Sequence, residues 1–173
     1  MTAYSFTRVS KAEQCGLAYQ HAYIFKERGP KTDALKLGTL VHATLEQAIA
    51  AVMEAQYIGT LNHEKVMQMY GRKYAEAYDG GGSLQVFEDG AAMVRSWLAR
   101  VGPVDYRRYM AIEESFVVDV GGISLRGVVD LVEQEPDGSI TVVDYKTNRA
   151  LYTRQEVEES LQLGIYALAA SIL

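Results

Sequence analysis

The sequence predicts an α/β protein in which a helical half is followed by three strands and a closing helix. Apolar residues recur at helical spacing through about the first hundred residues, and β-like apolar runs replace them afterwards. A chain of 173 residues suits one domain with a sizeable core. We therefore expect a single domain over 1–173, with a helical part over about 1–103 and a strand core with a final helix over about 104–173.

Four helices are expected in the first half. The first is capped by Ser5 or Thr7 and runs to about Arg28, where Gly29-Pro30 stops it. The others are expected over 37–56, 62–78 and 84–101, and Asn62 caps the middle one of these three.

Three strands are expected over 109–120, 123–133 and 139–146, before a helix over 154–172. Gly121-Gly122 predicts a two-residue hairpin, and Pro136-Asp137-Gly138 predicts a second turn. Because side chains alternate along a strand, Asp144 and Lys146 are predicted to share one face of the third strand.

The composition excludes several classes of protein. No apolar run approaches the ~20 residues of a membrane helix, and the N-terminus lacks an apolar signal core, so we expect a cytoplasmic protein with no membrane partner. Cys15 is the one cysteine, which excludes an internal disulfide and an iron–sulfur cluster in this chain. The net charge of −5 disfavours a general nucleic-acid coat protein but is compatible with an acidic active site.

Two carboxylates and a lysine form the most informative pattern. Asp130 ends an apolar run that begins at Gly127, and Asp144 follows on the next predicted strand, so a hairpin brings the two together. Two carboxylates suit Mg²⁺ or Mn²⁺. Lys146 can then hold a phosphate or orient a water molecule. A surface ion pair between Lys146 and either aspartate is the alternative.

Two helical pairs add further candidates. His42 and Glu46 lie four residues apart and share a helix face, where His42 is either a metal ligand or a packed core histidine. Gln162 and Tyr166 share a face in the same way, and either reach phosphate or base edges or simply belong to an amphipathic helix.

Taken in order, these motifs resemble the RecB-type nuclease branch of the PD-(D/E)XK superfamily, which includes CRISPR-adaptation and phage recombination exonucleases. The resemblance covers roughly residues 5–170. The motifs are Gly38-Thr39-x-x-His42-x-x-Leu45-Glu46, Gly127-x-x-Asp130, Asp144-Tyr145-Lys146-Thr147 and Gln162-x-x-x-Tyr166.

The resemblance implies an αβββαβ core, with a central mixed sheet flanked by helices, and Mg²⁺- or Mn²⁺-dependent DNA cleavage. It implies that His42, Asp130, Asp144 and the backbone carbonyl of Tyr145 ligate the metal, and that Lys146 assists catalysis. It also implies that Glu46 and Glu113 are candidate accessory acids, and that Gln162 and Tyr166 contact DNA or brace the site. The histidine motif implies an exonuclease acting in recombination, repair or DNA processing.

Basic residues suggest where DNA enters. Residues 1–40 hold six Lys/Arg against three Asp/Glu, whereas the remainder holds eleven against nineteen, which is either functional or chance variation. Sequence-neutral phosphate contacts are expected at Lys26, Arg28, Lys31 and Lys36. A helicase or recombination protein is an expected partner, and an oligomer is compatible with the sequence.

Two alternatives remain open from the sequence. The chain is either a nuclease or a non-catalytic DNA-binding or assembly module on the same fold, and RNA is an alternative substrate. Because the family core continues beyond the Gln-x-x-x-Tyr helix into another strand, the chain is expected to be either truncated after Leu173 or a minimal form of the core.

Overall fold

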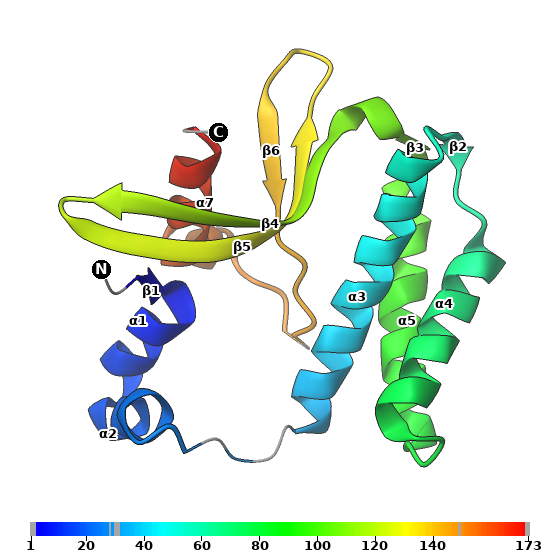
Figure 1. The fold of residues 1–173 in the computed structure, drawn as a ribbon. Coiled ribbons are helices and arrows are strands. Elements are labelled where there is room, and N and C mark those ends of the chain that lie inside the picture. The colour runs from blue at the N-terminus through cyan, green and yellow to red at the C-terminus, as the bar shows by residue number, and fades with distance from the viewer. Residues whose placement is uncertain (1–2, 28, 30–31, 149, 172–173) are drawn as a thin grey trace. The chain divides into compact units, whose positions relative to one another are not determined.

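The computed structural model describes residues 3–27, 29, 32–148 and 150–171, which form both helices and strands (Figure 1). The predicted α/β class is therefore confirmed. The chain divides into two compact units. Unit 1 comprises Met1–Pro30, Glu113–Val129 and Ala150–Leu173, and unit 2 comprises Lys31–Ile112 and Asp130–Arg149. The single domain stays a prediction.

Three long helices make up most of unit 2, and they match the helices predicted there. They are α3 (Asp33–Glu54), α4 (His63–Tyr78) and α5 (Leu84–Val101). Asn62 caps α4 as predicted, accepting a hydrogen bond from the Lys65 N–H at 3.0 Å. α3 starts before the predicted residue 37, because Thr32 caps it by accepting a hydrogen bond from the Leu35 N–H at 3.3 Å.

These helices enclose a tightly packed apolar core. Its fully buried members include Tyr70 and Val94, and Leu45 on α3 is 2% exposed. Gly90 on α5 is required for this packing, because a β-carbon there would collide with the Tyr70 hydroxyl and with Leu37. A second cluster joins α3 to the strands and consists of Ile49, Val52, Val104, Tyr109 and Leu131.

Short elements lie between α3 and α4 and between α5 and β4 (Tyr109–Val120). β2 (Ile58–Thr60) and β3 (Pro103–Asp105) pair antiparallel, and the 3₁₀ turn η2 (Tyr106–Arg108) follows. None of the three was predicted, because three residues are too few to establish a periodic pattern.

The main sheet is mixed. β4 (Tyr109–Val120) and β5 (Ile123–Gln134) form a hairpin, and β5 also pairs in parallel with β1 (Tyr4–Ser5) and antiparallel with β6 (Ile140–Val143). Gly121 and Gly122 have φ of 60° and 84°, which confirms the predicted hairpin turn. Both β4 and β5 pass from one unit into the other.

The prediction that Asp144 and Lys146 share a strand face is wrong. β6 ends at Val143, and residues 144–148 form an irregular segment, which we call the DYKT loop. The two side chains nevertheless meet, as described below.

The first predicted helix is wrong as a single element. It consists of α1 (Phe6–Gln14), α2 (Gly16–Tyr19) and the π-helical turn η1 (Gln20–Ile24). Ser5 caps α1 as predicted, but Cys15 is extended and its sulfur accepts a hydrogen bond from the Ala18 N–H at 3.5 Å, which starts a new helix. The predicted end at Arg28, and Pro30 of the predicted stop, lie outside the described residues.

The final helix is likewise divided, into α6 (Arg154–Glu158) and α7 (Leu161–Ala170). Ser160 between them is extended, and its hydroxyl accepts a hydrogen bond from the Leu163 N–H at 3.3 Å. The predicted end at Ile172 lies outside the described residues. Within the described part of the chain, every helix is too short or too polar to span a bilayer.

Candidate active site

Asp130 on β5 contacts polar groups from two other segments of unit 2. Its Oδ2 accepts a hydrogen bond from the Tyr145 backbone N–H at 2.7 Å. Its Oδ1 lies 3.4 Å from Nδ1 of His42 on α3. The Asp130 side chain is only 13% exposed, so these two partners offset much of the cost of removing a carboxylate from water. Asp130 thereby connects β5 to both α3 and the DYKT loop.

The packing of α3 fixes the position of His42. Its neighbours Val41 and Leu45 are 3% and 2% exposed and belong to the main core of unit 2. The imidazole meets the Tyr145 ring edge-on, with centroids 6.2 Å apart and an interplanar angle of 88°. With Val41 and Leu45 buried beside it on α3, His42 faces Asp130 and Tyr145.

Gly38 lets the DYKT loop lie close to α3. A β-carbon at Gly38 would stand 3.1 Å from Oγ1 of Thr147, which is tighter than an ordinary contact. The first and third motifs of the sequence therefore meet at this point. A larger residue at position 38 would push Thr147, and with it the loop, away from the helix.

The DYKT loop carries an acid and a base that pair with each other. Nζ of Lys146 lies 2.5 Å from Oδ2 of Asp144, whose side chain is 7% exposed while that of Lys146 is 37% exposed. The ion pair that the sequence left open is thus present. Its lysine reaches solvent, whereas its carboxylate faces inward.

Tyr145 anchors this loop. Its ring packs against both apolar clusters of unit 2. Burial raises the pKa of its phenol, and a hydrogen bond with Trp97 acts in the opposite direction. The neutral, packed side chain of Tyr145 therefore holds Asp144 and Lys146 on either side of it in place.

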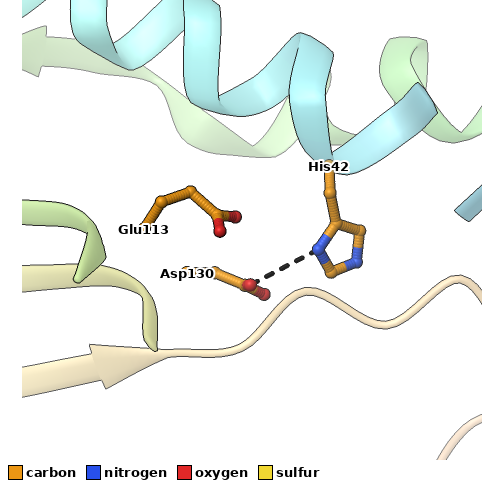
Figure 2. A group of neighbouring side chains, drawn as sticks. All are labelled: His42, Glu113 and Asp130. Carbon is orange, nitrogen blue, oxygen red and sulfur yellow. Dashed lines mark ion pairs between the residues drawn. The ribbon is translucent and has the colours of Figure 1, made fainter. Parts of the chain in front are cut away.

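Glu113 on β4 joins His42 and Asp130 in one group. One potential ligand atom from each of the three residues lies within 4.8 Å of those of the others (Figure 2). Glu113 has a left-handed backbone, with φ of 47°, inside a strand. For a residue other than glycine this conformation costs on the order of 1–3 kcal/mol and is concentrated at functional sites.

The donor set fits a hard divalent cation. Two carboxylates and an imidazole within 4.8 Å of one another are ligands that Mg²⁺ and Mn²⁺ accept. Asp130 and His42, which both belong to unit 2, supply two of the three donors. Among the described residues Asp144 does not belong to this group, and its carboxylate is engaged with Lys146.

The other predicted site residues lie elsewhere. Gln162 and Tyr166 belong to unit 1, where Nε2 of Gln162 donates a hydrogen bond to the Tyr166 hydroxyl at 2.7 Å. Lys26 belongs to unit 1, whereas Lys36 belongs to unit 2 and lies 4.9 Å from the Tyr78 ring centroid. Glu46 is exposed one turn beyond His42. Arg28 and Lys31 lie outside the described residues.

Sequence reasoning missed three features of these sites. It gave Gly38 no packing role and did not foresee that the Tyr145 N–H would hold Asp130, although a glycine inside a predicted helix is a usable signal of close approach. It also missed Phe116 and Arg126, which line one cavity of unit 1 together with Gln162 and Tyr166. These residues lie far apart in the sequence, so local spacing carries no sign that they come together.

Comparison with known proteins identifies the family. The chain is 27% identical over 128 residues to one subunit of the ATP-dependent helicase/deoxyribonuclease of Streptococcus uberis (strain ATCC BAA-854 / 0140J), a match that covers 69% of this chain and 11% of that protein. No solved structure matches the chain. The model of the PD-(D/E)XK nuclease superfamily matches residues 3–172. The resemblance of the motifs is therefore confirmed, and the chain belongs to the PD-(D/E)XK nuclease superfamily.

Proposed function

We propose that the chain is a deoxyribonuclease that hydrolyses phosphodiester bonds with the help of Mg²⁺ or Mn²⁺. The observation that carries the proposal is the arrangement around Asp130, which pairs with His42 and, through the Tyr145 N–H, holds the loop that bears Asp144 and Lys146. All five residues belong to unit 2, so their arrangement is local to one compact unit.

Each residue has a distinct proposed role. Asp130 and His42 would hold the cation, together with Glu113, Asp144 and the backbone carbonyl of Tyr145. A cation bound there would supply Lewis-acid stabilisation and would lower the pKa of a water molecule. Lys146, held in place by Asp144, neutralises charge on the phosphoryl oxygens. In the overall reaction one water molecule is consumed and one P–O bond of the phosphodiester breaks. The water oxygen forms a new P–OH group, and the leaving oxygen becomes a free hydroxyl.

We further propose that cleavage begins at DNA ends, on the basis of the histidine motif. Lys26, Arg28, Lys31 and Lys36 are the proposed phosphate contacts. The name of the Streptococcus uberis relative supports a helicase partner in a DNA-processing assembly. A cytoplasmic location remains a prediction.

The test compares end-labelled linear DNA with covalently closed circles, each with Mg²⁺, Mn²⁺ or EDTA. Asp144→Asn is the inactivating variant, and Asp79→Asn is its matched control. Asp79 ends α4 in a left-handed conformation that asparagine tolerates, and it is remote in sequence from every proposed ligand.

We expect metal-dependent loss of linear DNA by the wild type and by Asp79→Asn, and none by Asp144→Asn. Cleavage of circles as well would overturn the requirement for ends but keep the nuclease. Binding of DNA without cleavage under every metal condition would contradict the proposal and favour the binding module.

A further inference from the structure

Trp97 on α5 is the one tryptophan of the chain, and it belongs to none of the four motifs. Together with Tyr145 it packs against both apolar clusters of unit 2. Its neighbours Val94 and Leu98 on the same helix are 0% and 4% exposed and belong to the main core. The helix therefore holds the indole in place by close packing.

The single polar group of this indole is directed at the DYKT loop. A tryptophan N–H can only donate a hydrogen bond, and that of Trp97 donates to the hydroxyl of Tyr145. Burying either group without a partner costs free energy, so the bond favours one placement of the Tyr145 ring over others. In this way α5 holds the side chain of the second residue of the loop.

Tyr145 reaches the candidate site through two other groups. Its backbone N–H donates to Oδ2 of Asp130 at 2.7 Å, and its ring meets the His42 imidazole edge-on. A tyrosine has only two side-chain torsions between its hydroxyl and its backbone. Fixing the hydroxyl therefore restrains the backbone N–H as well. Trp97 is thus linked to Asp130 and His42 through one intervening residue.

The alternative is that this hydrogen bond stabilises the core and has no effect on the site. Tyr70 on α4 provides a measure of that effect, because its hydroxyl donates to the Phe87 carbonyl at 3.0 Å in the same main core. Its ring contacts Tyr74 and Phe87. Removing the Tyr70 hydroxyl thus deletes a comparable hydrogen bond whose partner lies on α5 and not on the DYKT loop.

We propose that Trp97 is a positioning residue for DNA cleavage, which acts through Tyr145 to keep the Tyr145 N–H on Asp130. The consequence for cleavage rests on the proposed function, whereas the placement of the N–H depends on neither metal nor DNA. Residues that orient a metal ligand in this indirect way typically contribute about 10–100-fold to affinity or activity. Because Trp97 acts on the site and not on the substrate, its loss should lower kcat and leave KM unchanged.

Three single variants test the inference. Trp97→Phe keeps an aromatic ring and removes the N–H, Tyr145→Phe keeps the ring and removes the acceptor, and Tyr70→Phe is the matched control. The double variant of Trp97→Phe and Tyr145→Phe completes a mutant cycle. For each protein we measure kcat and KM on end-labelled linear DNA at saturating Mn²⁺, and the melting temperature. Hydrogen exchange of the Tyr145 N–H is followed by NMR in EDTA without DNA.

The single tryptophan also supplies a direct spectroscopic check of the bond. Its indole N–H gives one resonance in a proton–nitrogen correlation spectrum. That resonance should shift in Tyr145→Phe and keep its position in Tyr70→Phe. An unmoved resonance in Tyr145→Phe would overturn the inference, because the hydroxyl would then not be the partner of the indole.

We expect Trp97→Phe and Tyr145→Phe each to lower kcat at least about tenfold, with KM within about twofold of the wild type. Exchange of the Tyr145 N–H should become at least about tenfold faster in Trp97→Phe. The double variant should lose no more than about twofold beyond the larger single loss, since both changes remove the same bond. Tyr70→Phe should lower the melting temperature but stay within about twofold of the wild type in kcat and in exchange.

Equal losses of kcat in Tyr70→Phe and Trp97→Phe would overturn the inference, because stability alone would then explain both. Multiplied losses in the double variant would overturn it as well. If Trp97→Phe does not fold, the comparison of Tyr145→Phe with Tyr70→Phe decides the question.

The positioning role and the nuclease fail separately. Wild-type cleavage of DNA together with unchanged kcat in Trp97→Phe refutes the positioning role alone. A wild-type chain that cleaves no DNA with either metal refutes the nuclease, and the exchange rates then still decide whether Trp97 keeps the Tyr145 N–H on Asp130.

Discussion

Among the described residues, more apolar side chains are buried in unit 2 than in unit 1. Two apolar clusters support α3, α4 and α5 in unit 2, with Tyr70 and Val94 fully buried. The large apolar side chains that unit 1 exposes include Leu17, Phe25 and Leu151, at 63%, 58% and 92% exposure. Asp130, His42, Asp144 and Lys146 belong to unit 2, whereas Glu113 belongs to unit 1. The four residues of unit 2 thus lie on the packed scaffold that a preorganised group requires.

The largest expected effect separates the two units by activity. Asp130→Asn in unit 2 should reduce the rate of DNA cleavage by at least about 10³-fold, because it removes the charge that faces His42. The fold should persist, since the asparagine oxygen can still accept the Tyr145 N–H. Cleavage rates and melting temperatures of the purified variant check both statements.

Asp119→Asn in unit 1 is the matched control for that change. Asp119 is exposed in the hairpin, and its Oδ1 accepts a hydrogen bond from the Gly122 N–H at 2.9 Å, a role that asparagine can also fill. Cleavage by this variant should stay within twofold of the wild type. A comparable loss in both variants would mean that activity does not depend on the Asp130 group in particular.

The next effect compares the stability lost when the same substitution, isoleucine to alanine, is made in each unit. Ile49→Ala on α3 should lower the free energy of unfolding by about 2–5 kcal/mol, since Ile49 is 1% exposed within a packed cluster. Ile165→Ala on α7 should cost less than half as much, because Ile165 lines a cavity of about 530 Å³ within unit 1 and has fewer packing partners on that side. Urea unfolding of both variants measures the difference. Equal costs would contradict the contrast in packing.

Glu113 provides a smaller and sharper test at the point where β4 continues from unit 2 into unit 1. A protein is usually more stable by about 0.5–1 kcal/mol with alanine than with glycine at a position inside a strand. At Glu113 the order should be reversed, because its φ of 47° favours glycine. We expect the free energy of unfolding of Glu113→Gly to exceed that of Glu113→Ala by about 1 kcal/mol. Both variants should lose cleavage activity. The usual order of the two would show that the left-handed backbone is not maintained.

The smallest effect concerns pH and lies in unit 2. Burial raises the pKa of Glu133, with Arg108 opposing and Glu135 reinforcing the shift. Because the folded-state pKa exceeds the unfolded value, the folded state binds the proton more tightly. The stabilisation that the bound proton contributes is complete below the unfolded-state pKa of Glu133, and it is lost as the pH rises through the folded-state pKa.

Glu133→Gln removes this dependence. Measured by urea unfolding between about pH 4 and about pH 7, the free energy of unfolding of the variant should rise relative to the wild type as pH increases. A relative change in the opposite direction would place the folded-state pKa of Glu133 below its unfolded value.

The sequence was informative where patterns are local. The bounds of α5 and the turn at Gly121-Gly122 agree with prediction, because helical periodicity and paired glycines act within a few residues. Asn62 was recognised as a cap for the same reason. Ser160 and Cys15 were missed although both cap a helix, because each interrupts an apolar pattern that otherwise continues.

The sequence motifs named residues that the structure brings together in pairs, but they did not give the contacts that hold them, and the roles of these residues stay predictions. The motifs singled out His42, Asp130, Asp144 and Lys146, and Asp130 pairs with His42 and Asp144 with Lys146. The left-handed backbone of Glu113 and the hydrogen bond from Tyr145 to Asp130 depend on contacts between segments far apart in the chain. Spacing along one sequence contains no information on such contacts.

Binding of Mn²⁺, followed by isothermal titration calorimetry, tests the central claim most directly, because it requires no substrate and no knowledge of cleavage polarity. The wild type and Asp119→Asn should bind the ion with the same affinity, and Asp130→Asn should bind it at least about tenfold more weakly. Equal affinity in Asp130→Asn and the wild type would contradict the assignment of the metal to the Asp130 group.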